Sequence, residues 1–165
     1  MKLSFKILAI STLALLMSCG EKDTKKEEKI SIGTTQPKKE EVKKEVAKAS
    51  ETIDLTNKGI GPITSVTLDA EINSAMALKG EEVFKAKCTA CHKIGKKFIG
   101  PAPNKILERR TPEWVMNMIL NPEEMTQKDP LAKQLLIEFN GSPMANQGLT
   151  EEEARSILEY FRTLE

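Results

Sequence analysis

The chain has few histidine, cysteine and aromatic residues. Among 165 residues there are one histidine and three cysteines, and aromatic residues make up 4%. The histidine is His92, and the cysteines are Cys19, Cys88 and Cys91. A structural zinc site takes four Cys or His ligands, and too few remain after Cys19 to supply them. A zinc-stabilised fold is therefore excluded, and so is a pair of histidines binding one metal within the chain.

The chain also has no large excess of charge of either sign. Charged residues make up 30% of the sequence, yet the formal net charge is only +1. Proteins that bind nucleic acids concentrate positive charge on one face or carry a strongly basic domain. The charge balance therefore predicts no nucleic-acid partner.

A long membrane-spanning segment is missing too. The most apolar stretch, Ile7 to Met17, is shorter than the about 20 residues that cross a bilayer. Lys2 and Lys6 precede it, as in an export signal. Its end, Leu16-Met17-Ser18-Cys19, resembles the lipobox of bacterial lipoproteins.

That resemblance implies an N-terminal lipid anchor. Residues 1–18 would be a lipoprotein signal peptide, cleaved before Cys19, whose sulfur would then receive a diacylglyceryl group. Several acyl chains at one site hold a protein stably on a membrane. The implied localisation is the bacterial cell envelope, on the periplasmic side, with the protein lipid-anchored to the membrane. A conventional signal peptide, or a short anchor in which Cys19 has no role, is the alternative.

Two segments without a strong apolar pattern follow. Residues 19–51 consist mostly of Lys, Glu, Thr, Ser and Val, so they bury too little surface to offset the entropy of ordering, and we expect a flexible charged tether. About thirty residues of such chain span about 30 Å. Residues 52–73 are expected to form an N-terminal arm, in which Ile63, Val66 and Leu68 predict a short extended piece.

The remaining residues, 74–165, carry helical patterns of apolar residues. Strands and helices do not alternate, so a small all-α domain of about four helices is predicted. Each helix has end signals of its own, namely caps, prolines or glycines. The predicted helices are Ser74–Lys87, one capped by Thr111 that starts at Pro112 and is ended by Asn121-Pro122, Leu131–Phe139 ended by Asn140-Gly141, and a last one with Thr150 and Glu153 at capping-box spacing.

One motif in this domain carries chemistry. Cys88-Thr89-Ala90-Cys91-His92 has the C-x-x-C-H spacing of covalent haem attachment. Two thiols at this spacing add across the two vinyl groups of one haem edge, and the adjacent imidazole is then placed to bind the iron. We therefore predict one covalently bound haem c, with Cys88 and Cys91 as thioether residues and His92 as an iron ligand.

Other uses of a C-x-x-C pair fit the sequence less well. A thioredoxin-like redox pair lies in an α/β context, whereas a predicted helix leads into Cys88. A disulfide between Cys88 and Cys91 remains open in an oxidising compartment, but it would give His92 and the export signal no joint role. Haem attachment uses all three residues and takes place outside the bacterial cytoplasm, where the signal directs the chain.

From about Ala77 to its end, the chain resembles a class I c-type cytochrome. The matching residues besides the haem motif are Gly80 and Phe84 in the helix before it, the Gly100-Pro101 pair after it and Tyr160 in the last helix. The resemblance implies the small all-α fold of that family around one haem. It also implies that the carbonyl of Pro101 accepts the free N–H of His92 and so fixes the ring.

The resemblance further implies a methionine as second axial iron ligand, in a loop shortly before the last helix. Met144 has that position, although Ala145 follows it where the family usually has proline. Met125, in another predicted loop, is the second candidate, and an open position or a different ligand is the third. Met116 and Met118 fall inside a helical pattern and are interpreted as core residues.

A haem with both axial positions filled favours electron transfer. A thioether ligand stabilises ferrous iron and blocks the position where oxygen or peroxide would bind. We therefore predict a membrane-anchored carrier, not an enzyme, that transfers single electrons between a redox protein donor and acceptor of a respiratory chain. The layout is similar to cytochromes associated with nitrous-oxide reductases, so the acceptor is expected to be such a reductase or a terminal oxidase. The alternatives are a haem protein whose open distal site binds a small gas or reduces peroxide, and a fixed domain of a larger complex.

Charged residues are unevenly distributed along the domain. Lysines around an exposed haem edge would steer it to an acidic partner, with an ordinary solvated surface as the alternative. Trp114 is expected to belong to the haem-pocket core, with donation of its N–H to a haem propionate as an additional role. The lysines near the motif are Lys85, Lys87, Lys93, Lys96, Lys97 and Lys105, and the acidic residues near the C-terminus are Glu151, Glu152, Glu153 and Glu159.

Overall fold

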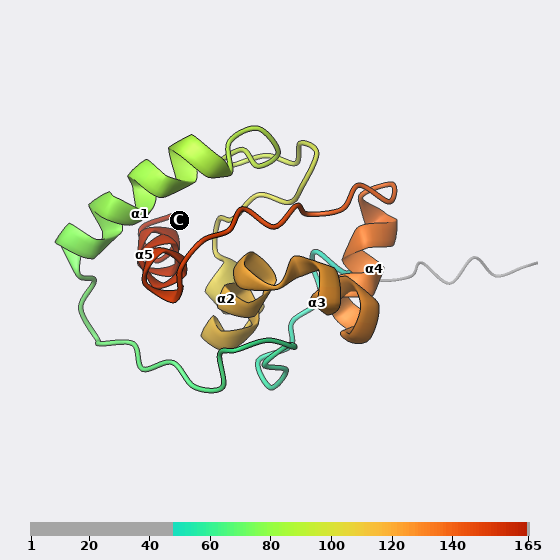
Figure 1. Cartoon of the computed structure of the whole chain (residues 1–165), viewed down its shortest axis with the longest axis horizontal. Helices are drawn as coiled ribbons and strands as arrows, with labels where there is room; N and C mark the ends of the chain where they lie inside the picture. Colours follow the sequence, from blue (N-terminus) through green and yellow to red (C-terminus); the bar gives the residue numbers. More distant parts are fainter. Residues whose placement is uncertain (1–47, 165) are drawn as a thin grey trace, which may run out of the picture. The chain divides into compact units, whose positions relative to one another are not determined.

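The computed structural model describes residues 48–164 (Figure 1). The predicted signal peptide, the lipidation residue Cys19 and the tether as far as residue 47 lie outside this part. Residues 48–164 form five α-helices and a 3-10 helix, with isolated bridges but no strand in that range, so the predicted all-α fold class is confirmed. No helix there is long and apolar enough to cross a membrane. The elements are α1 Ser74–Lys87, the 3-10 helix Ile106–Glu108, α2 Pro112–Leu120, α3 Pro122–Lys128, α4 Pro130–Glu138 and α5 Glu151–Phe161.

The helices begin at the predicted caps. The side chain of Thr111 accepts a hydrogen bond from the N–H of Trp114, at the start of α2. At the start of α5, the side chain of Thr150 accepts from the N–H of Glu153, whose carboxylate accepts from the N–H of Thr150. This reciprocal pair satisfies two backbone donors that would otherwise lack partners.

Helix α3 replaces the loop expected from the sequence. Asn121 ends α2, and Pro122 is the first residue of α3. Proline disfavours a helix in the residue before it, yet its fixed φ and missing N–H suit the first position of the next helix. The expectation that Met125 lies in a loop is therefore wrong, because Met125 lies in α3 and is fully buried.

Helices α1 and α5 cross at close range (Figure 1). Gly80 permits this approach, because a Cβ at that position would lie 1.9 Å from the carbonyl oxygen of Ser156. Phe84 is 2% exposed and packs against Tyr160 and Phe161, with ring centroids 5.6 Å apart in both pairs. The crossing therefore unites residues on which the resemblance was based, and it fixes the point from which the C-x-x-C-H segment leaves α1.

The arm runs past α4, α3 and α2 to the start of α1 (Figure 1). Side chains of α2 hold its backbone: the N–H of Ile63 donates to Asn117 Oδ1 at 2.9 Å, and the N–H of Val66 donates to Glu113 Oε1 at 3.2 Å. The side chain of Ile63 is buried in the core. The arm is thus bound by buried polar side chains, not by a neighbouring strand.

Packing begins before the expected start of the arm. Residues 48–51, assigned to the tether because of their polarity, form a turn in which Ala49 is 4% exposed. The N–H and hydroxyl of Ser50 donate to the carboxylate of Glu138 in α4, at 2.8 and 2.5 Å. Residues 48–51 therefore belong to the packed domain and are counted with the arm from here on.

Glu159, one of the acidic residues near the C-terminus, is buried. Its side chain is 1% exposed, lies 2.6 Å from Arg155 and from Arg162, and accepts the N–H of Asn73 at 2.8 Å. Arg162 also donates to the carbonyl oxygens of residues 69–71 in the arm. Glu159 is therefore the centre of a polar cluster that joins α5 to the arm and to the start of α1.

Candidate functional site

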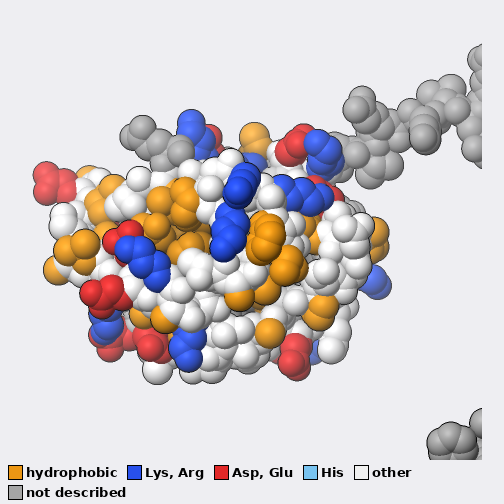
Figure 2. Space-filling view, turned by 90° about the horizontal axis from the view of Figure 1, so that it is seen from above, with side chains coloured by type: hydrophobic (Ala, Val, Ile, Leu, Met, Phe, Trp, Pro, Cys, Tyr) orange, Lys and Arg blue, Asp and Glu red, His pale blue; other side chains and the backbone are white. Residues whose placement is uncertain are grey.

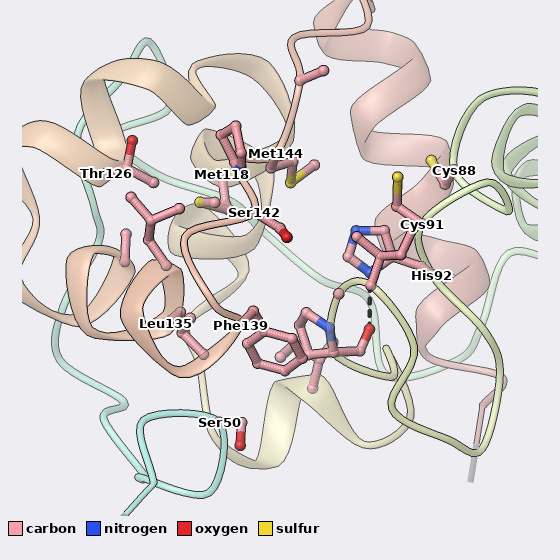
Figure 3. Close-up of a pocket in the computed structure, with 18 of the residues that line it drawn as sticks. Ser50, Cys88, Cys91, His92, Met118, Thr126, Leu135, Phe139, Ser142 and Met144 are labelled. Carbon is pink, nitrogen blue, oxygen red and sulfur yellow. Dashed lines mark hydrogen bonds between the residues drawn. The ribbon is translucent and has the colours of Figure 1, made fainter. Parts of the chain in front are cut away.

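A pocket lies among the C-x-x-C-H segment, α2, α4 and the loop before α5 (Figure 3). It holds about 1070 Å³ of empty space, counting the part open to solvent. Its walls are largely apolar, so a hydrophobic ligand is favoured there. The apolar wall residues are Ile99, Ile106, Trp114, Met118, Ala132, Leu135, Leu136, Phe139 and Pro143.

Both predicted attachment cysteines line this pocket (Figure 3). Cys88 follows α1 directly, and its carbonyl accepts the N–H groups of Cys91 and His92 at 3.0 and 2.9 Å, so the motif forms a tight turn at the end of the helix. The two thiols are not joined in a disulfide. Burial, with a smaller effect from Cys91, raises the pKa of the Cys88 thiol to about 11. A redox-active pair needs a lowered thiol pKa instead.

His92 is held in one orientation. Its Nδ1 lies 2.8 Å from the carbonyl oxygen of Pro101, and because a carbonyl only accepts, Nδ1 carries the proton and Nε2 keeps a lone pair. The second ring nitrogen faces Met144 across the pocket (Figure 3). Gly100 leaves room for the ring, since a Cβ at that position would lie 2.6 Å from His92 Cε1. The imidazole is therefore oriented to bind a metal from one side of the pocket.

The two methionines considered as second ligand lie in different places. Met144, in the loop between α4 and α5, lines the pocket and points into the space in front of His92 (Figure 3). Met125 Sδ instead accepts the N–H of Ile60 in the arm at 2.9 Å, and Met125 is not part of the pocket wall. Met118, interpreted as a core residue, lines the pocket on the same side as Met144 (Figure 3).

Trp114 belongs to the pocket wall and is 4% exposed. Its Nε1–H donates to Asp129 Oδ1 at 3.2 Å, and that oxygen also accepts the N–H of Ala132 at 2.7 Å. The indole has a single N–H donor, and it is used within the protein. The expectation that Trp114 donates to a haem propionate is therefore wrong.

Several pocket residues carry no recognisable sequence signal. Arg109 and Arg110 line the pocket just before the cap of α2, Ser50 reaches it from the arm, and Gln147 lies in the loop with Met144. Arginine is almost never fully buried unless paired, so a sequence gives no reason to place Arg110 inside. Ser50 lies in a polar stretch typical of a tether.

Lysines lie around the pocket together with exposed hydrophobic residues. Lys87 lines the pocket, and Lys97 Nζ lies 4.3 Å from the ring centroid of the wall residue Phe139. Phe98, 5.3 Å from Lys93 Nζ, is 48% exposed. Figure 2, which views the molecule from the top of Figure 1, shows lysine and arginine side chains next to exposed hydrophobic ones. The pocket-wall residue Lys87, together with Lys93, Lys97 and the exposed Phe98, is named the lysine rim.

The donor set suits a haem better than a metal ion held by protein ligands alone. Within residues 48–164, no three His, Cys, Asp or Glu side chains come together as a metal site. Instead, an imidazole and a thioether face each other across an apolar pocket with two thiols beside it (Figure 3). This set suits a c-type haem: thiols for attachment, nitrogen and sulfur as possible iron ligands, and apolar walls for the ring.

The stretch that forms the pocket is similar to known proteins. Residues 77–165 match the family model described as cytochrome c. A solved cytochrome c from Rhodothermus marinus is 44% identical, over 70% of this chain and 92% of that one, with a TM-score of 0.60. An engineered form of it, Rma TDE, is 43% identical over 70% and 93%, also with a TM-score of 0.60. The engineered form bound to a carbene intermediate, 1-ethoxy-1-oxopropan-2-ylidene, gives 0.58. No curated protein matches the chain.

Proposed function

The chain belongs to the cytochrome c family and carries one covalent haem c, and from this premise we propose that it is a one-electron carrier with His92 and Met144 as the iron ligands. Cys88 and Cys91 hold the haem through thioether bonds. One observation carries the proposal: these four side chains line a single pocket, with the imidazole and the thioether facing each other (Figure 3).

The residues of this chain set the conditions for electron transfer. Haem supplies the iron that takes up and releases the electron. The Pro101 carbonyl keeps the His92 ring from rotating and makes it a better ligand. The Met144 thioether favours the ferrous state and raises the reduction potential, and it leaves no position for a small substrate. The apolar walls keep water away from the site.

We propose attachment to the membrane on the periplasmic side. The lipobox-like sequence Leu16 to Cys19 supports this location, and the polar residues after Cys19 support a tether. A Cys19→Ser variant should then lose labelled palmitate and appear in the soluble fraction. Membrane association that survives this substitution would contradict the lipid anchor.

We propose acidic redox proteins as donor and acceptor. The lysine rim supports an acidic docking surface, because opposite charge raises encounter rates. The layout of arm and domain supports a terminal reductase or oxidase as acceptor, with nitrous-oxide reductase as the named candidate. Electron transfer from the reduced protein to purified nitrous-oxide reductase, slowed by salt, is the expected result. A rate of electron transfer that does not change with salt concentration would contradict an acidic docking surface on the partner.

Covalent attachment and carrier activity are tested on the haem-loaded full chain. Wild-type protein should keep its haem when it is denatured. Folded wild-type protein should show a single reversible one-electron wave by spectroelectrochemistry. Cys88→Ala and Cys91→Ala should each leave one vinyl group unreacted, which shifts the absorption of the reduced pyridine complex to longer wavelength. Two intact thioether bonds in either variant would contradict the assignment.

One observation favours a second candidate, a haem protein that binds a small molecule at the distal side. The engineered Rhodothermus marinus relative is described as bound to a carbene intermediate. In this chain Met144 lies in a loop, so its displacement would break no helix. Carbon monoxide binding by wild-type haem at a rate comparable to that of an open site would favour this function over electron transfer.

A further inference from the structure

Arg110 is buried and donates only to carbonyl oxygens. Its side chain is 1% exposed, the largest among the fully buried side chains. One terminal nitrogen donates to the carbonyls of Thr52 and Arg109, and the other donates to that of Ala49 at 2.6 Å. Its Nε is shielded from solvent and has no hydrogen-bond partner. Its Cζ also lies 5.1 Å from the ring centroid of Trp114, which stabilises the positive charge in part, but none of these partners is an anion.

The nearby carboxylates do not supply the missing anion. Asp54, Asp129 and Glu138 act on the charge of Arg110 from a distance, and none forms an ion pair with it in the described residues. Their oxygens accept from other donors instead, among them the N–H groups of residues 56 and 57, Trp114, Ala132 and Ser50. Burial and the charge of Arg109 lower the pKa of Arg110.

Arg109 repeats this pattern beside Arg110. Its terminal nitrogens donate to the carbonyl oxygens of Lys105 and Asn104 at 3.2 and 3.1 Å, and its Nε also lacks a partner. Both arginines line the pocket. Two adjacent positive charges repel each other, so an anion in the pocket would stabilise both.

The position of Arg110 identifies the end of the pocket that needs this anion. It donates to the carbonyls on either side of Ser50, those of Ala49 and Thr52, and Ser50 lies at the end of the pocket away from Cys88 and Cys91 (Figure 3). In haem, the two propionate carboxylates stand on the edge opposite the vinyl groups that react with cysteine. Attachment at the cysteines therefore leaves the carboxylates for the arginine end.

We propose that Arg110, assisted by Arg109, binds the haem carboxylates and thereby couples the haem to the docking of the N-terminal arm. Guanidinium groups pair with carboxylates through strong, directional hydrogen bonds. The same Arg110 side chain holds the arm on both sides of Ser50, so it is a positioning residue shared by cofactor and arm. The inference rests on haem occupying the pocket as proposed above.

The coupling acts in both directions. An anion at Arg110 stabilises the guanidinium in the orientation that binds the carbonyls of Ala49 and Thr52, and a docked arm keeps that guanidinium in the pocket. By linkage, each event strengthens the other by the same factor. Residues 49–52 are therefore fixed next to the carboxylate edge of the haem.

The test uses the haem-loaded full chain with ¹³C-labelled haem carboxylates. Arg110→Gln keeps N–H donors but removes the charge, so the carboxylate titration midpoint should rise by about one pH unit or more. Amide hydrogen exchange at Ser50 and Asp54 should become about tenfold faster or more. Glu138→Gln is the matched control: it weakens the Ser50 contact, so it should speed exchange at Ser50 without raising the carboxylate titration midpoint.

Two further readouts keep the inference testable. Should Arg110→Gln not fold, wild-type protein should still show a nuclear Overhauser effect between the Nε–H of Arg110 and propionate methylene protons. An unchanged titration midpoint in Arg110→Gln with a loosened arm, or no such effect in wild type, would overturn the role of Arg110. A wild-type spectrum that is not low-spin would instead contradict the proposed axial ligation.

Discussion

His92 Nδ1 and the carbonyl oxygen of Pro101 lie 2.8 Å apart, and the residue before Pro101 has no room for a side chain. The hydrogen bond fixes the tautomer and the ring plane, while Gly100 lets the loop approach the ring closely. The proline carbonyl and the glycine together make the imidazole a rigid ligand.

Gly100→Ala should disturb the ligation of the haem. The added Cβ would lie 2.6 Å from His92 Cε1, and overpacking of this kind costs about 1–3 kcal/mol. Absorption spectra should show a smaller low-spin fraction, and urea unfolding should show lower stability. Gly95→Ala, in the same loop with φ +73° and nothing within 4 Å, should cost only backbone strain of about 1–2 kcal/mol. A wild-type spectrum in Gly100→Ala would show that the ring tolerates displacement.

Phe84→Ala should strongly destabilise the crossing of α1 and α5. Phe84 is 2% exposed and contacts the rings of Tyr160 and Phe161, and removal of such a side chain costs about 3–5 kcal/mol. The free energy of unfolding, measured with urea on haem-loaded protein, checks this. Phe98→Ala is the control, because Phe98 is 48% exposed and should cost about 1 kcal/mol or less. Equal losses of stability in the two variants would contradict a large contribution of the α1–α5 crossing to the stability of the fold.

Glu159 should contribute stability that is lost in acid. Burial raises the pKa of Glu159, but hydrogen bonds from Arg155 and the N–H of Asn73, with the charges of Arg155 and Arg162, outweigh it and leave the pKa below the ordinary 4.5. A carboxylate with a lowered pKa in the folded state stabilises the fold above the unfolded pKa, and this stability disappears as pH falls through the folded value. Wild-type protein should therefore lose stability below about pH 4.5.

Glu159→Gln isolates this contribution. At pH 7 it should cost about 3 kcal/mol, since it leaves two arginines unpaired that keep some contact with solvent. Its stability should then vary less than that of wild type between pH 6 and pH 3. Glu152→Gln is the control, because the pair of Glu152 with Lys79 is exposed and screened. The free energy of unfolding, measured with urea at each pH, gives the comparison. An equal loss of this free energy in acid for wild type and Glu159→Gln would contradict the contribution assigned to Glu159.

Charge reversal in the lysine rim should change reaction rates with small charged oxidants. Lys87→Glu combined with Lys97→Glu should slow oxidation by the anion ferricyanide by about tenfold at low ionic strength and speed oxidation by a cationic cobalt complex. The control Lys79→Glu with Lys128→Glu makes the same change in net charge away from the pocket wall. Stopped-flow kinetics at several salt concentrations checks this, and equal effects of the two pairs would assign the change to net charge alone.

Local patterns predicted much of the fold. The bounds of α1, the cap of α2 and the capping box of α5 follow from residues that act within one helical turn. The haem motif is equally local, since Cys88, Cys91 and His92 lie in one turn of chain. These features need no knowledge of distant contacts.

Features that depend on contacts between residues far apart in sequence could not be predicted. Pro122 indicated the end of one helix but gave no sign that it begins α3, and the partner of Met125 in the arm lies far away in sequence. Arg110 and Glu159 have charges typical of surfaces, yet each is 1% exposed because carbonyls or arginines from other segments surround it. Burial of polar side chains is set by tertiary partners, which composition does not reveal.

The identity of the sixth ligand is the central claim, and absorption spectra of the haem-loaded chain test it most directly. Oxidised wild-type protein should be low-spin with the weak near-infrared methionine–iron band, and reduced wild-type protein should not bind carbon monoxide readily. Met144→Ala should lose the band and bind carbon monoxide, while Met125→Leu, whose residue lies outside the pocket wall, should match wild type. High-spin wild-type haem that binds carbon monoxide, or loss of the band in Met125→Leu but not in Met144→Ala, would contradict the His92 and Met144 ligation.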